Sequence, residues 1–318
     1  MDLTAGVQEG PIYNAYFGFT QSPFNLSPDP TFFYRSTQHE EALANLIYGV
    51  QSRKGFIVLT GEVGTGKTTL LECLRDYLYG HQIEFAFLFN SRITPQEFFE
   101  MIAYDFDLRC ERTSKTEVLF ALNQMLLEQA GRGRTTVLIV DEAHNLEWEV
   151  LEEIRMLGNL ENRGGKLLQV ILAGQPELDR KLDAPNLRQL KQRIVLRTAL
   201  RQFSEAETVD YIQARLATAG METNTVFPAE LMSEVHVRSQ GIPRLINAIC
   251  DNLLLTCFAL EVESATIEML DEVTHDMRLE WPGRRFRARG QGPHTNGHGS
   301  AAISDDPFRQ APQFSRGD

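Results

Sequence analysis

Residues 61–69 read Gly61-Glu62-Val63-Gly64-Thr65-Gly66-Lys67-Thr68-Thr69, directly after the apolar run Phe56-Ile57-Val58-Leu59-Thr60. The stretch matches G-x-x-x-x-G-K-[ST], whose glycines let backbone N–H groups and a helix N-terminus surround phosphates. The apolar run predicts the strand that must precede such a loop, and residues 69–74 predict the helix that must follow. We therefore expect a nucleotide triphosphate to bind at residues 61–69, with Lys67 at the β- and γ-phosphates and Thr68 on Mg²⁺. The alternative is a glycine-rich turn without a ligand.

A second motif is Thr136-Val137-Leu138-Ile139-Val140-Asp141-Glu142-Ala143-His144. Its apolar run is typical of a central parallel strand covered on both faces. Asp141 at the strand end is expected to hold the Mg²⁺ shell, and Glu142 to orient and deprotonate a water. This favours an ATPase over a small-molecule kinase, which needs a second substrate site. Without the phosphate loop, a solvated helix N-terminus would explain the two carboxylates better.

The composition fits a cytoplasmic enzyme. The chain has 318 residues, 42% of them hydrophobic, and no apolar run approaches the length of a transmembrane helix. The N-terminal residues do not follow the pattern of a secretory signal. The four cysteines show no C-x-x-C spacing, so we expect buried free thiols. The net charge of −12 disfavours an extended nucleic-acid coat and leaves room for a local basic groove.

Strand and helix patterns alternate along the first two thirds of the chain, which indicates an α/β fold with a doubly wound parallel sheet. Capping residues predict helices that begin at Thr37, Thr94 and Ser114, and a further helix over residues 147–162. Expected strands cover residues 56–60, 85–89, 136–140, 167–175 and 194–196. One strand lies between the phosphate-loop strand and the acidic strand along the chain, an order that suits motor-like ATPases better than small GTPase switches.

Four regions are expected from the change in sequence character. Residues 1–36 form an aromatic arm that packs near the nucleotide, and residues 37–200 form the ATPase domain. Residues 201–281 contain helical patterns only and predict a lid. Residues 282–318 carry six arginines against three aspartates among Gly, Ser, Pro and His, and are expected to be a disordered basic tail.

The chain resembles the AAA+ ATPases, which join a P-loop core to a helical lid, and more narrowly the ExeA/GspA-type secretion ATPases. The resemblance covers about residues 13–280 and extends beyond the two motifs above. The other motifs that support the resemblance are Phe24-Asn25-Leu26-Ser27-Pro28-Asp29-Pro30 with Phe33-Tyr34, Gly174-Gln175-Pro176-Glu177-Leu178, Gln192-Arg193-Ile194 and Gly241-Ile242-Pro243-Arg244-Leu245-Ile246-Asn247. It implies a five-stranded parallel sheet between helices, a small all-helical lid, and ATP and Mg²⁺ as ligands.

The resemblance also implies roles for individual polar residues. Gln175 would sense the γ-phosphate, and Asn90 would hold Glu142 away from the water until assembly is right. Arg193 would reach the γ-phosphate of the next subunit, with Arg188 as the competing residue. The alternatives are a turn residue for Gln175, a cap for Asn90 and a surface ion pair for either arginine.

Arg244 follows Pro243 at the start of a predicted lid helix, and the resemblance implies that it contacts the nucleotide and couples hydrolysis to the lid. Phe33 and Tyr34 would border the adenine, or would simply pack within the arm.

The implied function is an oligomeric ATPase, in a ring or filament, that powers or regulates assembly of an envelope secretion or export apparatus. Type II secretion, pilus biogenesis and exosortase-linked polysaccharide export are the pathways of the family. The alternative is a DNA-associated transposition helper that recruits a transposase, so DNA is a further candidate partner. Known secretion members continue into a transmembrane helix and a peptidoglycan-binding domain, which we do not find. We expect a cytoplasmic protein whose contact with the inner membrane is peripheral.

Overall fold

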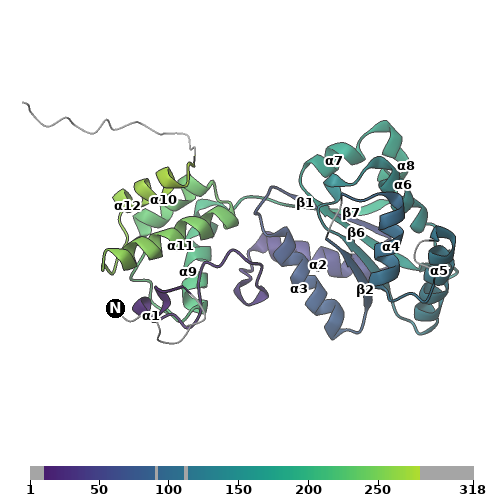
Figure 1. Ribbon diagram of the computed structural model, residues 1–318, viewed down its shortest axis with the longest axis horizontal. Coiled ribbons are helices and arrows are strands. Elements are labelled where there is room, and N and C mark those ends of the chain that lie inside the picture. The colour runs from purple at the N-terminus through teal and green to yellow at the C-terminus, as the bar shows by residue number, and fades with distance from the viewer. Residues whose placement is uncertain (1–10, 90–91, 111–113, 280–318) are drawn as a thin grey trace, which may run out of the picture. The chain divides into compact units, whose positions relative to one another are not determined.

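The computed structural model describes residues 11–89, 92–110 and 114–279. A parallel five-stranded sheet runs in the order β2-β3-β6-β1-β7 (Figure 1). The strands are β1 Phe56–Gly61, β2 Glu84–Leu88, β3 Thr136–Val140, β6 Leu168–Gly174 and β7 Ile194–Leu200. The predicted α/β fold with five parallel strands is confirmed.

Helices cover both faces of the sheet because its central strands are apolar on both faces. In β1, Ile57 and Leu59 pack with α2 and α3, whereas Phe56 and Val58 pack with α4, α5 and α6 on the other face (Figure 1). These helices are α2 Thr37–Gln51, α3 Lys67–Gly80, α4 Pro95–Asp105, α5 Lys115–Gly131 and α6 Trp148–Leu157. The phosphate-loop motif and the acidic motif both follow the carboxyl ends of their strands, where parallel α/β sheets bind ligands.

The helix starts follow the capping residues with one exception. Thr94 and Glu97 form the expected reciprocal capping box of α4. α2 begins at Thr37 as expected, but its capping residue is Ser36 and not Thr37: the Ser36 hydroxyl accepts from the backbone N–H of His39. The same Ser36 hydroxyl lies 2.7 Å from Nδ1 of His39, so the start of α2 fixes an imidazole.

The helix expected over residues 147–162 is shorter than predicted. It ends at Leu157, and a small antiparallel hairpin follows, with β4 Glu161–Asn162 and β5 Gly165–Lys166. Gly165 has φ +116°, a conformation that a glycine adopts without strain. The side chain of Asn162 accepts a hydrogen bond from the backbone N–H of Gly164, a local turn that competes with helix.

The helical region after β7 has a core of its own. It comprises α9 Glu205–Thr218, α10 Ala229–Ser239, α11 Pro243–Ala259 and α12 Ile267–Asp276. Aromatic residues of the N-terminal segment, among them Tyr13, Phe19 and Phe24, belong to this core, and the short helix α1 Asn14–Phe17 lies beside it (Figure 1). The N-terminal segment therefore folds against the lid helices.

Short elements complete the connections: η1 Pro30–Phe32, η2 Ala143–Asn145, α7 Glu177–Leu182, η3 Pro185–Leu187 and α8 Arg188–Lys191. All four cysteines are free thiols, of which Cys250 and Cys257 are buried and the other two are partly exposed. Among the described helices, none has the length and apolarity that crossing a membrane requires.

Candidate nucleotide-binding site

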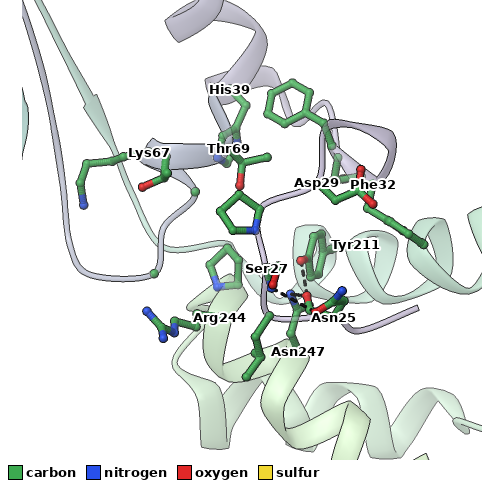
Figure 2. A pocket seen from close by; sticks show the side chains of 18 of the residues that line it. Asn25, Ser27, Asp29, Phe32, His39, Lys67, Thr69, Tyr211, Arg244 and Asn247 are labelled. Carbon is green, nitrogen blue, oxygen red and sulfur yellow. Dashed lines mark hydrogen bonds between the residues drawn. The ribbon is translucent and has the colours of Figure 1, made fainter. Parts of the chain in front are cut away.

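A cavity of about 180 Å³ lies where the loop after β1, the N-terminal segment and the lid helices meet. Its lining includes Gly64, Lys67 and Glu142 from the sheet domain and Arg244 from the lid. In Figure 2, Lys67 lies at one end of the cavity, while Tyr211 and Asn247 point toward Asn25. Segments that are distant in the sequence therefore share one site.

Lys67 is a buried cation held by carbonyl groups. Its ammonium donates to the carbonyl oxygens of Gly61 at 2.8 Å and Glu62 at 3.0 Å, and the residue is 6% exposed. Burial lowers the pKa of Lys67, and the nearby carboxylates of Glu142, Asp141 and Glu62 oppose that shift. No carboxylate of the described residues lies within ion-pair distance of the ammonium. A buried cation without a paired anion fits a site for phosphate.

Thr68 and Asp141 form an oxygen pair next to Lys67. The Thr68 hydroxyl donates to Oδ2 of Asp141 at 3.3 Å, and Oδ1 of Asp141 accepts from the backbone N–H of Glu142 at 2.8 Å. Burial raises the pKa of Asp141, with the neighbouring Glu142 adding to the shift, while that N–H, Thr68 and Lys67 act against it. Hydroxyl and carboxylate oxygens are the ligands that Mg²⁺ prefers, so this pair fits the predicted metal position.

Glu142 lines the cavity and has a left-handed backbone conformation, with φ +52°. Such a conformation costs a non-glycine residue about 1–2 kcal/mol, and it is found repeatedly at functional sites. Oε2 of Glu142 lies 3.3 Å from Nδ1 of His144. Glu142 therefore lines the cavity, and one of its carboxylate oxygens lies close to an imidazole.

Gln175, which follows β6, reaches the same imidazole. Its backbone N–H donates to Nδ1 of His144 at 3.4 Å, and its side-chain Nε2 lies 3.1 Å from Nε2 of the ring. Gln175 is absent from the cavity lining and is joined to Glu142 through His144. The sequence singled out Gln175 and Glu142 but gave His144 no role.

The loop glycines are close to other segments. A Cβ on Gly64, which has φ +81°, would lie 2.7 Å from Cβ of Arg244, whose backbone N–H donates to the Gly64 carbonyl at 3.2 Å. A Cβ on Gly66, with φ +97°, would lie 3.0 Å from Nε2 of His39. Glycine is required at both positions by the backbone angle and by the available space.

His39 holds the loop through a hydrogen bond, a role that the sequence did not predict. Its Nε2–H donates to the carbonyl of Thr65 at 3.0 Å, and its Nδ1 accepts from the Ser36 hydroxyl at 2.7 Å. The side chain is buried against Phe33 and Phe203, and burial lowers its pKa. The one sequence signal for this role was that a polar residue, His39, occupies the third position of α2.

The remaining residues of the loop line the cavity or stabilise the loop itself. Val63 and Thr69 line the cavity, and the side chain of Thr65 is buried and donates to the carbonyl of Glu62 at 2.8 Å. The Thr65 side chain therefore stabilises the turn of the loop from within.

A buried polar cluster holds the N-terminal segment at the opposite end of the cavity. Arg215 on α9 donates to the carbonyls of Pro23 and Asn25 and to the Tyr211 hydroxyl, which in turn donates to Asn247 at 2.8 Å. Arg215 is 6% exposed, its guanidinium lies 4.6 Å from the Phe32 ring, and no carboxylate of the described residues pairs with it. Sequence reasoning missed this cluster.

The other predicted residues lie away from the cavity or outside the description. Arg193 is partly buried and donates to the backbone carbonyl of Arg155 at 2.9 Å, whereas Arg188 is exposed at the start of α8. Neither lines the cavity, but Phe33 and Tyr34 both do. Asn90 lies outside the described residues.

Residues 50–182 match the family model described as an AAA domain. General secretion pathway protein A of Aeromonas hydrophila is 43% identical over 249 residues, which make up 78% of this chain and 45% of that protein. The chain belongs to the AAA+ P-loop ATPase family, in the group of general secretion pathway protein A. It spans less than half of that relative's length, so the similarity describes the shared region alone.

Two solved AAA+ structures are similar to this chain. Cdc6p from Pyrobaculum aerophilum has a TM-score of 0.62 with 18% identity, over 79% of this chain and 71% of that chain. The structure titled Drosophila ORC bound to DNA has a TM-score of 0.64 with 19% identity, over 88% of this chain and 69% of that chain. At such low identity the likeness shows the AAA+ fold alone.

Proposed function

We propose that this chain binds ATP together with Mg²⁺, hydrolyses it to ADP and phosphate, and moves its lid in the process. The carrying observation is that buried Lys67, the Thr68–Asp141 pair and Glu142 meet at one cavity, to which the lid contributes Arg244. A cation, a metal-type oxygen pair and a carboxylate base are the parts that phosphate ester hydrolysis needs.

The phosphate-binding part is the loop of residues 61–69. Its backbone N–H groups and the start of α3 provide positive dipole ends, and the ammonium of Lys67 is already held at the loop carbonyls. Thr68 and Asp141 would hold the metal ion. When bound, Mg²⁺ neutralises charge on the phosphate oxygens.

Glu142 is the proposed general base. Its carboxylate lies at the cavity wall, where it can orient a water and take its proton. Its backbone is held in a strained left-handed conformation, with φ +52°. Gln175, joined to Glu142 by His144, is the proposed sensor of the terminal phosphate.

We assign the end of the cavity that would hold the adenine to the N-terminal segment and the lid. Residues 25–29 line it together with Phe33, Tyr34 and Arg244. The cluster around Arg215 holds the carbonyls of Pro23 and Asn25 in place. We accordingly divide the chain into an arm at residues 1–36, an ATPase domain at 37–200, a lid at 201–281 and a tail at 282–318, with nucleotide bound between the first three.

The proposal includes a homo-oligomer in which an arginine of one subunit completes the next subunit's site. Arg193 is the sequence-based candidate, but its hydrogen bond to Arg155 supports a structural role within its own subunit. The exposure of Arg188 supports it as the residue that reaches a neighbour. An arginine supplied in trans would make hydrolysis depend on assembly.

The proposed setting is an envelope secretion or export apparatus, with its proteins as partners. The similarity to general secretion pathway protein A supports this setting. We further propose a cytoplasmic location, peripheral at the inner membrane.

Nucleotide binding by purified protein tests the proposal. Titration with ATP and Mg²⁺ should show saturable binding in the wild type and loss of binding in Lys67→Met. Lys54→Met is a matched control, because Lys54 lies over the Tyr48 ring and outside the cavity. Equal affinities of the wild type and Lys67→Met would refute the proposal. Phosphate release measured with and without double-stranded DNA would separate a secretion ATPase from a DNA-stimulated helper.

A further inference from the structure

We propose that Gln38 and His39, neighbours at the start of α2, are positioning residues that connect the loop at residues 61–69 to the lid. They do so through the linker of residues 201–204, which joins β7 to α9. This inference rests on the proposed function, because it assumes that phosphate binds at the loop. It gives phosphate a way to act on the lid that does not use the contact between the loop and α11.

The first step lies inside the loop, at the carbonyl oxygen of Glu62. That oxygen accepts from the Lys67 ammonium at 3.0 Å, from the Thr65 hydroxyl at 2.8 Å and from the Thr65 backbone N–H at 3.3 Å. An ammonium makes stronger, charge-assisted hydrogen bonds to phosphate oxygens than to a carbonyl. Phosphate that draws Lys67 away from Glu62 therefore changes the hydrogen bonding of the turn at Thr65.

The second step leads from Thr65 to the linker through the imidazole of His39. Nε2–H of the ring donates to the Thr65 carbonyl at 3.0 Å, and the centre of the ring lies 5.6 Å from that of the Phe203 ring. The imidazole is buried, and the Ser36 hydroxyl fixes its orientation by donating to Nδ1 at 2.7 Å. Because buried groups are closely packed, a shift of the Thr65 carbonyl acts on the linker through His39.

Gln38 makes the third contact, in which its side-chain amide holds the backbone of Arg201 at two points. Its Oε1 accepts from the Arg201 N–H at 2.9 Å, and its Nε2 donates to the Arg201 carbonyl at 3.1 Å. The amide thus pairs with the linker as a neighbouring strand does, directly after β7 ends. Because Gln38 and His39 are adjacent, one turn of α2 holds both the loop and the linker.

On the lid side, the linker packs against Gly241, which lies just before α11. The backbone N–H of Phe203 donates to the Gly241 carbonyl at 2.8 Å, and a Cβ on Gly241 would collide with the Phe203 carbonyl oxygen. Gly241 has φ +69°, so both the backbone angle and the space require glycine. A shift of the linker therefore moves the start of α11, where Arg244 lies.

Inorganic tripolyphosphate with Mg²⁺ tests the connection, because it carries phosphates for the loop and has no base to contact the arm. The measurement is hydrogen exchange of the Phe203 amide with and without tripolyphosphate. We expect the bound ligand to slow this exchange about fivefold in the wild type. The readout is the change that the ligand causes, which loss of a purely structural residue would leave the same.

Two variants interrupt the two contacts separately. His39→Phe keeps an aromatic ring against Phe203 but loses the donor to Thr65. Gln38→Leu, a change at a partly exposed position, loses both bonds to Arg201. In each variant tripolyphosphate should still bind, and its effect on the Phe203 amide should fall below about twofold.

Gln124→Leu is the matched control. Gln124 is exposed on α5, on the opposite face of the sheet from α2, and donates to Glu128 at 3.1 Å. The control should respond to tripolyphosphate as the wild type does. Undiminished slowing in either His39→Phe or Gln38→Leu, or no slowing in the wild type, would overturn the proposal.

Failure of this connection is distinguishable from failure of the proposed function. A protein that binds neither ATP nor tripolyphosphate would refute the function itself. A protein that binds ATP, and in which tripolyphosphate leaves exchange of the Phe203 amide unchanged, would refute the connection alone.

Discussion

The backbone N–H of Arg244 donates to the carbonyl oxygen of Gly64 at 3.2 Å, so the lid is joined to the loop at residues 61–69 through their main chains. The bond uses one of the first N–H groups of α11, which has no partner within the helix. Any ligand that changes the loop at Gly64 therefore acts directly on the start of a lid helix.

Gly64→Ala should break this connection. The left-handed backbone costs alanine about 1–2 kcal/mol, and the new Cβ would lie 2.7 Å from Cβ of Arg244. Hydrogen exchange should show faster exchange of the Arg244 amide than in the wild type. Gly80→Ala, at the end of α3 with open space around it, should leave that amide unchanged. Unchanged exchange in Gly64→Ala would contradict the account.

His39 should make stability depend on pH. Burial lowers its pKa in the folded protein, although the Thr65 carbonyl and Glu207 act against the shift. The unfolded chain therefore binds a proton first as pH falls below about 6.5, and the free energy of unfolding decreases from there until the pH passes the folded-state pKa. Urea unfolding at several pH values should show this decrease, and His39→Gln should show less of it. Identical pH profiles would refute the assignment.

Arg215→Met should destabilise the fold and loosen the arm. The change leaves the Pro23 carbonyl and the Tyr211 hydroxyl without their buried donor, at a cost of about 2–4 kcal/mol. Urea unfolding measures the cost. Arg180→Met is the matched control, because Arg180 is 75% exposed at its side chain and pairs only with Glu177 in the described chain. A loss no larger than that of the control would show that the cluster does not hold the arm.

The meeting of the two motifs at one edge of the sheet could be predicted from the sequence because each motif is contiguous. Residues 61–69 follow a strand directly, and Asp141 and Glu142 end another, so the parallel sheet brings both motifs to one edge. His39 and Arg215 could not be predicted, because each acts on a segment reached only through tertiary folding: Thr65 for His39, and Pro23 with Asn25 for Arg215. The hairpin at residues 161–166 was missed, because its first strand, Glu161–Asn162, was taken as the end of the preceding helix.

Arg188 and Arg193 should differ in what they support. Arg188→Ala should leave folding and ATP binding intact and lower assembly-dependent hydrolysis by roughly 100-fold or more, as loss of an arginine in trans does. Arg193→Ala should instead lower stability by about 1 kcal/mol through the lost bond to the Arg155 carbonyl. Mixing each variant with Glu142→Gln subunits tests the geometry. Activity recovered only with Arg193→Ala would reverse the assignment.

Phosphate release and ATP binding by Glu142→Gln test the central claim most directly. Glutamine keeps the size and the polarity of Glu142 but cannot take a proton, so hydrolysis should fall by about 10²–10⁴-fold while the affinity for ATP stays within roughly threefold. Hydrolysis by Glu142→Gln at the wild-type rate would contradict the account.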